Sequence, residues 1–136
     1  MDANVKWAGG MAFEAQQDGF SIGLDADADF GGQGKGPKPK TLVLTALGGC
    51  TAMDVISILK KMQVSVEAFE VQASGDLTED HPKVFKAIHL KYVFKGKDLP
   101  LDKLQRAVGL SQDKYCGVSA MLAKACPVTH EIVTVA

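Results

Sequence analysis

The sequence has little arginine and almost no net charge. Fifteen basic residues stand against 16 acidic ones, which gives a formal net charge of −1, and Arg106 is the single arginine. Surfaces that bind nucleic acid are typically positively charged and use the bidentate hydrogen bonds of arginine side chains. No nucleic-acid partner is therefore expected.

Cysteine is scarce as well, with one residue at each of positions 50, 116 and 126. The residues that follow Met1 carry neither a basic segment nor an apolar stretch of the kind that directs secretion. An odd number of cysteines in a chain without such a leader predicts reduced thiols rather than a disulfide framework. We expect a cytoplasmic protein.

Only one long apolar run occurs, over residues 42–59, and its single charge is Asp54. Eighteen residues lie at the lower edge of the length that spans a membrane, and Gly48, Gly49 and Thr51 dilute the run. It predicts a helix over residues 42–62 that is buried on nearly every side. Because one chain offers limited cover for such a helix, a homodimer is expected and a membrane partner is not.

The remaining sequence alternates between two periodicities that together predict an α+β fold in one domain, residues 1–136. Gly9-Gly10 and Asp18-Gly19 predict two hairpin turns, and Asp98 is the expected cap of a helix that carries Pro100 in its first turn. The expected order is βββ-α-ββ-αα-β. The ranges are strands within residues 5–15 and 20–24, the helix 42–62, strands 67–77 and 84–94, a helix that follows Asp98, a short helix that begins near Cys116, and a strand at 129–135.

Two groups of residues have the spacing of metal ligands but lack a complete set. Asp25, Asp27 and Asp29 alternate at a strand end, without the glutamate that completes a calcium loop, so a solvated strand end is expected. Cys126 and His130 have zinc-like spacing, but no second ligand pair accompanies them. Neither group predicts a metal site.

The thiols are the candidate chemistry, because no serine elbow, phosphate-binding loop or H-E-x-x-H zinc motif is present. Cys50 follows Gly48-Gly49, a costly pair inside a helix, which indicates close packing of another backbone or room for a small substrate. Cys116 lies near a helix N-terminus and Lys114, an environment that favours the thiolate. Cys126 is expected to be structural. Taken alone, each cysteine is more often a small buried apolar residue than a reactive group.

Three motifs resemble those of the OsmC/Ohr family (osmotically inducible protein C and organic hydroperoxide resistance protein), most closely its uncharacterised OsmC-like branch. They are GPKPKTLVLTALGGCTAMDV at 36–55, KYCGVS at 114–119 and ACPVT at 125–129. The resemblance spans nearly the whole chain. It implies an OsmC-like domain with a long buried central helix, assembled as an intertwined homodimer.

The resemblance also implies a thiol-dependent peroxidase in oxidative-stress defence, acting on organic hydroperoxides and also on hydrogen peroxide. Cys50 would form a sulfenic acid and Cys116 would condense with it to a Cys50–Cys116 disulfide, which an external dithiol reduces without metal or cofactor. The alternative is a non-catalytic protein of this fold that binds a partner or senses oxidation. Here Thr41 stands where the family has a glutamate, and no arginine precedes Arg106. The cations that remain in that region are Lys35, Lys38 and Lys40.

Overall fold

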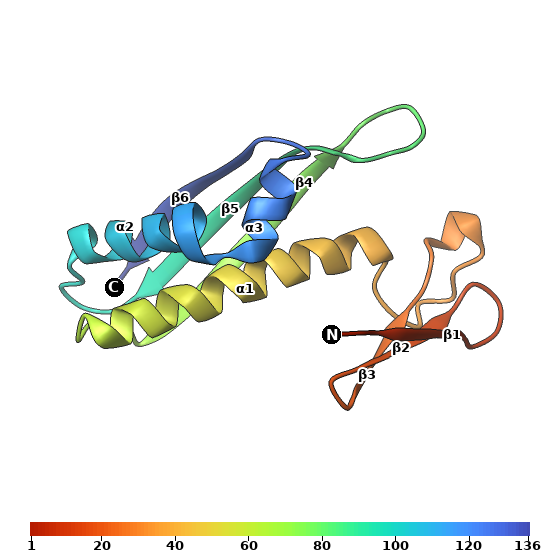
Figure 1. Cartoon of the computed structure of the whole chain (residues 1–136), viewed down its shortest axis with the longest axis horizontal. Helices are drawn as coiled ribbons and strands as arrows, with labels where there is room; N and C mark the ends of the chain where they lie inside the picture. Colours follow the sequence, from red (N-terminus) through yellow and green to blue (C-terminus); the bar gives the residue numbers. More distant parts are fainter. The chain divides into compact units, whose positions relative to one another are not determined.

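The computed structural model describes all residues from Met1 to Ala136 and divides them into two compact units, Met1–Val43 and Leu44–Ala136. Both units mix strands with helical segments (Figure 1). The α+β class and the βββ-α-ββ-αα-β order expected from the sequence are confirmed, with most element ends displaced by one to three residues.

The first unit is a three-stranded antiparallel meander of β1 (Asn4–Trp7), β2 (Phe13–Gln17) and β3 (Phe20–Leu24). The chain turns at Gly9, Gly10 and Gly19, all with positive φ, which glycine adopts without steric cost. Side chains on one face of the sheet come into register because Val5 pairs with Ala15 and Ala15 with Ile22. Both predicted hairpins are therefore confirmed.

The loop after β3 is organised by Asp25, which the sequence had indicated as part of a solvated strand end. Asp25 is instead 3% exposed. Its carboxylate accepts the backbone N–H groups of Ala26, Gln33 and Lys35 at 2.8, 2.9 and 3.1 Å, and a short 3-10 helix, η1 (Ala28–Phe30), lies inside the loop. For Asp25 the expectation is wrong because three backbone donors replace water around the carboxylate, whereas Asp27 and Asp29 are exposed as expected.

The second unit is built on a sheet of β4 (Ala68–Leu77), β5 (Phe85–Lys95) and β6 (Val128–Val135) in that order. β4 pairs antiparallel with β5, whereas β6 runs parallel to β5, and a parallel pair requires a long crossover connection such as the helical one found here. Alternate residues of β5 are buried, as the period-2 pattern predicts. These residues are Ile88, Leu90, Tyr92 and Phe94.

The crossover between β5 and β6 contains α2 (Leu101–Leu110), a single π turn η2 (Ser111–Tyr115) and α3 (Gly117–Ala123). Pro100 is the N-cap residue of α2 and Asp98 lies in the preceding turn with φ of 51°. The prediction that Asp98 caps this helix is therefore wrong. The start of α3 directly after Cys116 is confirmed.

The long helix α1 (Pro39–Lys61) buries one stripe instead of its whole circumference. The buried residues recur every fourth position, and α1 packs with α2 and the inner face of β5 in one apolar core (Figure 1). Met53, by contrast, is 76% exposed. Within one chain the cover is thus limited to one stripe, and burial of the other faces by a second copy stays a prediction. The stripe consists of Leu47, Thr51, Val55 and Leu59.

By length and composition alone, α1 is the one helix of this chain that could cross a membrane. The core helix of a soluble protein passes the same test, and the polar Thr51 belongs to the buried stripe of α1.

Candidate functional site

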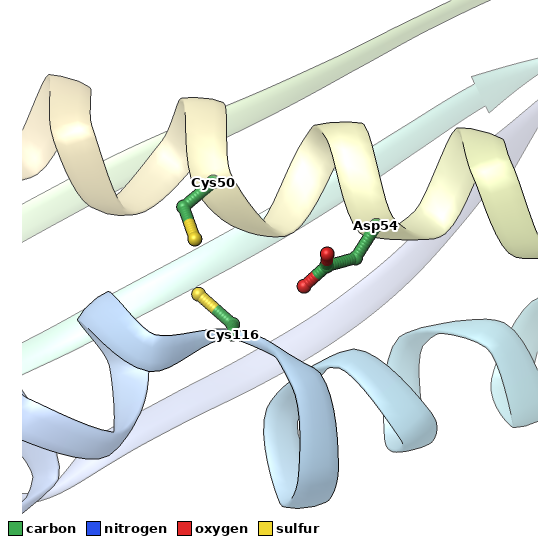
Figure 2. A group of neighbouring side chains, drawn as sticks. All are labelled: Cys50, Asp54 and Cys116. Atoms are coloured by element: carbon green, nitrogen blue, oxygen red, sulfur yellow. The ribbon is translucent and has the colours of Figure 1, made fainter.

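Two cysteines that lie 66 positions apart in the sequence meet at one carboxylate (Figure 2). Cys50 and Asp54 project from the same side of α1, one helical turn apart, and Cys116 faces them from the start of α3. The two sulfur atoms and a carboxylate oxygen of Asp54 all lie within 4.8 Å of one another. The structure therefore brings together the two cysteines singled out from the sequence, and adds Asp54.

The two thiols differ in solvent exposure. Cys50 is half-buried, whereas Cys116 is only 2% exposed. The backbone N–H of Ser119 donates to the Cys116 sulfur at 3.3 Å. Burial nevertheless raises the pKa of the Cys116 thiol to about 11, against the lowering effect of the Ser119 N–H and with further increases from Cys50 and Asp54. Cys116 therefore carries its proton at neutral pH.

The prediction that its helix terminus favours a Cys116 thiolate is thus wrong. One N–H donor is too little to compensate for the loss of water around a charged sulfur. Lys114, the cation expected to help, has its ammonium 5.3 Å from the ring centre of Tyr115.

A buried network of hydroxyl and amide groups surrounds the carboxylate side of the site. The Thr51 hydroxyl lies 2.7 Å from that of Tyr92 and 2.8 Å from that of Ser111. The Ser111 hydroxyl donates to Asp54 at 3.0 Å. The Gln112 amide donates to Tyr92 at 2.7 Å and to Thr51 at 3.2 Å. No buried side-chain nitrogen or oxygen in the structure is left without a partner.

These bonds have one consistent direction, because each hydroxyl has a single proton to donate. Ser111 donates to Asp54, so Thr51 must donate to Ser111 and Tyr92 to Thr51. The hydroxyl groups of Tyr92, Thr51 and Ser111 thus form a chain of hydrogen bonds. Each one donates to the next, and the last donates to the Asp54 carboxylate. The network holds this carboxylate in place beside the two sulfurs.

The sequence analysis missed Asp54 and its network as site residues. The signal was present, because Thr51 and Asp54 interrupt an otherwise apolar helix, and a buried polar group needs a partner. Their partners Tyr92, Ser111 and Gln112 carry no motif that identifies them.

Cys126 is buried apart from this site, as expected for a structural residue. His130, which has zinc-like spacing from it, packs edge-on against Tyr92 with ring centres 5.9 Å apart. The one group of residues positioned to hold a metal ion is instead Cys50, Asp54 and Cys116.

The glycine pair before Cys50 has no packing reason within its own chain. A Cβ atom added at Gly48 would lie 3.9 Å from the Val71 carbonyl oxygen, an ordinary contact, and one added at Gly49 would meet nothing within 4 Å. Close packing of a backbone from this chain therefore does not explain the pair. Close packing of a backbone from a second copy and room for a small substrate beside the sulfur both stay predictions.

No cation neutralises Asp54 within its own unit. The ion pair recorded in Leu44–Ala136 is His89 with Glu131, at 3.3 Å. The candidate lysines belong to the first unit, where the ammonium of Lys38 pairs with Asp27 at 3.2 Å. The Asp54 carboxylate is thus stabilised by a hydroxyl group rather than by an ion pair.

The fold and the paired thiols define an OsmC-like protein, and comparison with known sequences agrees. Residues 32–131 match the family of OsmC-like proteins. The protein YhfA of Escherichia coli K12 is 39% identical over 137 residues, covering 100% of this chain and 99% of that protein. The chain belongs to the OsmC-like family.

Solved structures show the same fold. A hypothetical protein from Aquifex aeolicus VF5 is 28% identical with a TM-score of 0.84, covering 99% of this chain and 97% of that one. The organic hydroperoxide resistance protein OhrB of Bacillus subtilis is 22% identical with a TM-score of 0.66, covering 97% of this chain and 98% of that one. At this identity the second likeness concerns the fold alone.

Proposed function

We propose that this protein is a thiol-dependent peroxidase that reduces organic hydroperoxides, with Cys50 as the attacking thiol and Cys116 as the resolving thiol. The observation that carries the proposal is the approach of a half-buried sulfur and a buried sulfur to within 4.8 Å. The structural neighbour OhrB, named for organic hydroperoxide resistance, supports the same substrate class. Oxidative-stress defence is the corresponding cellular role.

The first step joins an oxygen to the half-buried thiol of Cys50. The Cys50 thiolate attacks the O–O bond of the hydroperoxide, the bond breaks, and the sulfur becomes a sulfenic acid while the alkoxide leaves and is protonated to an alcohol. Hydrogen peroxide would give water in the same way. Cys50 is the reasonable first nucleophile because it is the more accessible of the two sulfurs.

The second step forms the disulfide. The Cys116 thiol loses its proton, its sulfur attacks the Cys50 sulfur, and the S–O bond breaks to release hydroxide, which becomes water. The Asp54 carboxylate lies within 4.8 Å of both sulfurs, so it is placed to accept the Cys116 proton and return it to the leaving hydroxide. An external dithiol then reduces the disulfide, and the cycle needs no other cofactor.

We also propose a cytoplasmic homodimer in which the outer face of α1 is covered by a second copy of the chain. Met53 and Ile56 support this, because both are apolar and exposed on a helix whose opposite stripe is buried. Light scattering that finds a stable, folded monomer at high dilution would contradict the dimer.

Intact-mass spectrometry after brief exposure to a bulky hydroperoxide tests the chemistry. Wild-type protein should lose about two mass units as the disulfide forms, and Cys116→Ser should gain about sixteen as sulfenic acid accumulates on Cys50. Cys50→Ser should remain unchanged at low peroxide.

Cys126→Ser is the matched control, because it removes a buried thiol outside the site. It should lose the same two mass units as the wild type. Equal consumption of peroxide by wild type and Cys50→Ser, with dithiothreitol as reductant, would exclude the proposed enzyme.

A further inference from the structure

We propose that the reduced site is also a binding site for a thiophilic divalent cation of the Zn²⁺ class, held by Cys50, Asp54 and Cys116. The inference goes beyond peroxide reduction. It uses the same three residues but does not depend on their reacting with a hydroperoxide.

The spacing of Cys50 and Asp54 on α1 is the first observation that supports a metal site. Cys50 and Asp54 are separated by four positions, which places both on one face of the helix, one turn apart. Two ligands at this spacing are the geometry that H-E-x-x-H helices use for zinc. Cys116 closes the set from the opposite side of the site, at the start of α3 (Figure 2).

The distances fit a cation after a small contraction. With Zn–S bonds of about 2.3 Å in tetrahedral geometry, two sulfur ligands lie about 3.8 Å apart. The three ligand atoms here lie within 4.8 Å of one another. Side-chain rotations that move the sulfurs by at most about 1 Å therefore complete the site.

The groups behind the ligands are those that orient a metal site. Ser111 donates a hydrogen bond to one oxygen of Asp54, and the Ser119 N–H donates to the Cys116 sulfur. Such outer hydrogen bonds hold ligands in position and tune metal affinity. Both donors leave further lone pairs of the carboxylate and the sulfur available for a metal.

The charge of the site also favours a cation. In the second unit no lysine or arginine forms an ion pair with Asp54, and the hydroxyl chain from Tyr92 ends on its carboxylate. Three ligands leave the fourth position of a tetrahedral cation open to water or another small ligand.

Binding exchanges protons for the metal ion. Each thiol loses its proton to solvent, two metal–sulfur bonds and one metal–oxygen bond form, and two protons are released per cation. Oxidation of both thiols to a disulfide, with a hydroperoxide as the oxidant, removes two of the three ligands. The bound cation also covers the Cys50 sulfur, so it should inhibit peroxide consumption.

The test is a Co²⁺ titration of the full-length, reduced protein, followed by thiolate-to-cobalt absorption and by proton release. We expect one Co²⁺ per chain, and its displacement by Zn²⁺, which binds N, O and S sites more tightly than Co²⁺. Cys50→Ser should abolish the absorption band, and protein oxidised with diamide should show none. Asp54→Asn, which preserves the shape of the side chain, should weaken binding at least about tenfold.

Cys126→Ser is the control and should bind as the wild type does. The band persisting in Cys50→Ser, or equal affinity in wild type and Asp54→Asn with both folded by circular dichroism, would overturn the site. If Co²⁺ binds but hydroperoxide produces no disulfide, the peroxidase proposal fails and the cation site stands. If the disulfide forms but Co²⁺ does not bind, the cation site fails and the peroxidase proposal stands.

Discussion

Asp25 in the first unit and Cys116 in the second are both buried acids next to backbone N–H groups, yet their pKa values move in opposite directions. Asp25 accepts three backbone N–H groups, which lower its pKa below the usual 3.8. Cys116 accepts one, and burial raises its pKa to about 11. The comparison shows that proximity to an N–H donor is insufficient by itself, because enough donors must replace the lost water.

The two groups consequently have different roles. The charged Asp25 holds a glycine-rich loop in one conformation, whereas Cys116 is protonated at neutral pH and would have to lose its proton before its sulfur could act as a nucleophile or a metal ligand.

The largest expected effect is the pH dependence of Cys116 alkylation. In a Cys50→Ser, Cys126→Ser double variant, the alkylation rate should rise between pH 7 and 11 by more than the roughly 10²-fold of an ordinary thiol. Burial, the largest cause of the raised Cys116 pKa, persists in this variant, and only the thiolate reacts. Mass spectrometry of iodoacetamide-treated protein measures this rate. N-acetylcysteine, titrated in parallel, controls for the reagent, and a rate that levels off near pH 7 would restore the helix-terminus argument.

Removing the Asp25 carboxylate should have the next largest effect. In Asp25→Ala the amides of Gln33 and Lys35 lose their acceptor, so their hydrogen exchange should accelerate on the order of tenfold to a hundredfold. Hydrogen-exchange NMR reports both amides directly. Asp29→Ala, on an exposed residue of the same loop, should leave them unchanged, and unchanged exchange in Asp25→Ala would show that the loop is held by other contacts.

Thr51→Val tests the hydroxyl network of the second unit. The change preserves the shape of the side chain but leaves the Tyr92 hydroxyl without its acceptor, so the free energy of unfolding should fall by about 1–3 kcal/mol. Chemical denaturation measures the loss. Ser57→Ala on the exposed side of the same helix should change stability by less than about 0.5 kcal/mol.

Acid should act selectively on the first unit. Because the folded pKa of Asp25 is below its unfolded value, its stabilising contribution is present above about pH 4 and is lost as the pH falls through the folded pKa. The amide chemical shifts of Gln33 and Lys35 should report this transition. Asp25→Asn should abolish it, and an unaltered transition in that variant would assign it to another group.

The smallest expected effect is a gain. Gly49→Ala adds a methyl group that meets nothing within 4 Å, so helix propensity should stabilise the protein by about 1 kcal/mol. Thermal unfolding measures the gain. A stable Gly49→Ala variant that loses peroxide consumption would show that a molecule from outside this chain uses the space.

Much of the fold could be predicted from the sequence because its signals are local. Alternation from Ile88 to Phe94 identified β5 and its buried face, and Gly9-Gly10 identified a hairpin. The start of α2 was misjudged because Asp98 is a residue type that commonly caps helices. In the structure the N-cap residue is Pro100. Composition indicated that one chain would not cover all of α1, but it did not indicate which faces of the helix stay exposed.

Only the two cysteines of the candidate site could be predicted from the sequence. Cys50 and Cys116 stood out through their motifs, whereas the partners of Asp54 did not. Thr51 and Ser111 are 60 positions apart in the sequence, and no local pattern records a hydrogen bond over that separation. A polar residue in an apolar helix indicates that a hydrogen-bond partner exists, but it does not indicate which residue that partner is.

The sequence by itself determined the order of the elements, the single long apolar helix and the two cysteines proposed as reactive groups, since periodicity and motif depend on neighbouring residues. Only the tertiary structure decided which buried acid is charged and which is neutral. That outcome depends on how many donors the fold delivers to each group in exchange for water. Three reach Asp25 and one reaches Cys116, so the carboxylate stays ionised and the thiol keeps its proton.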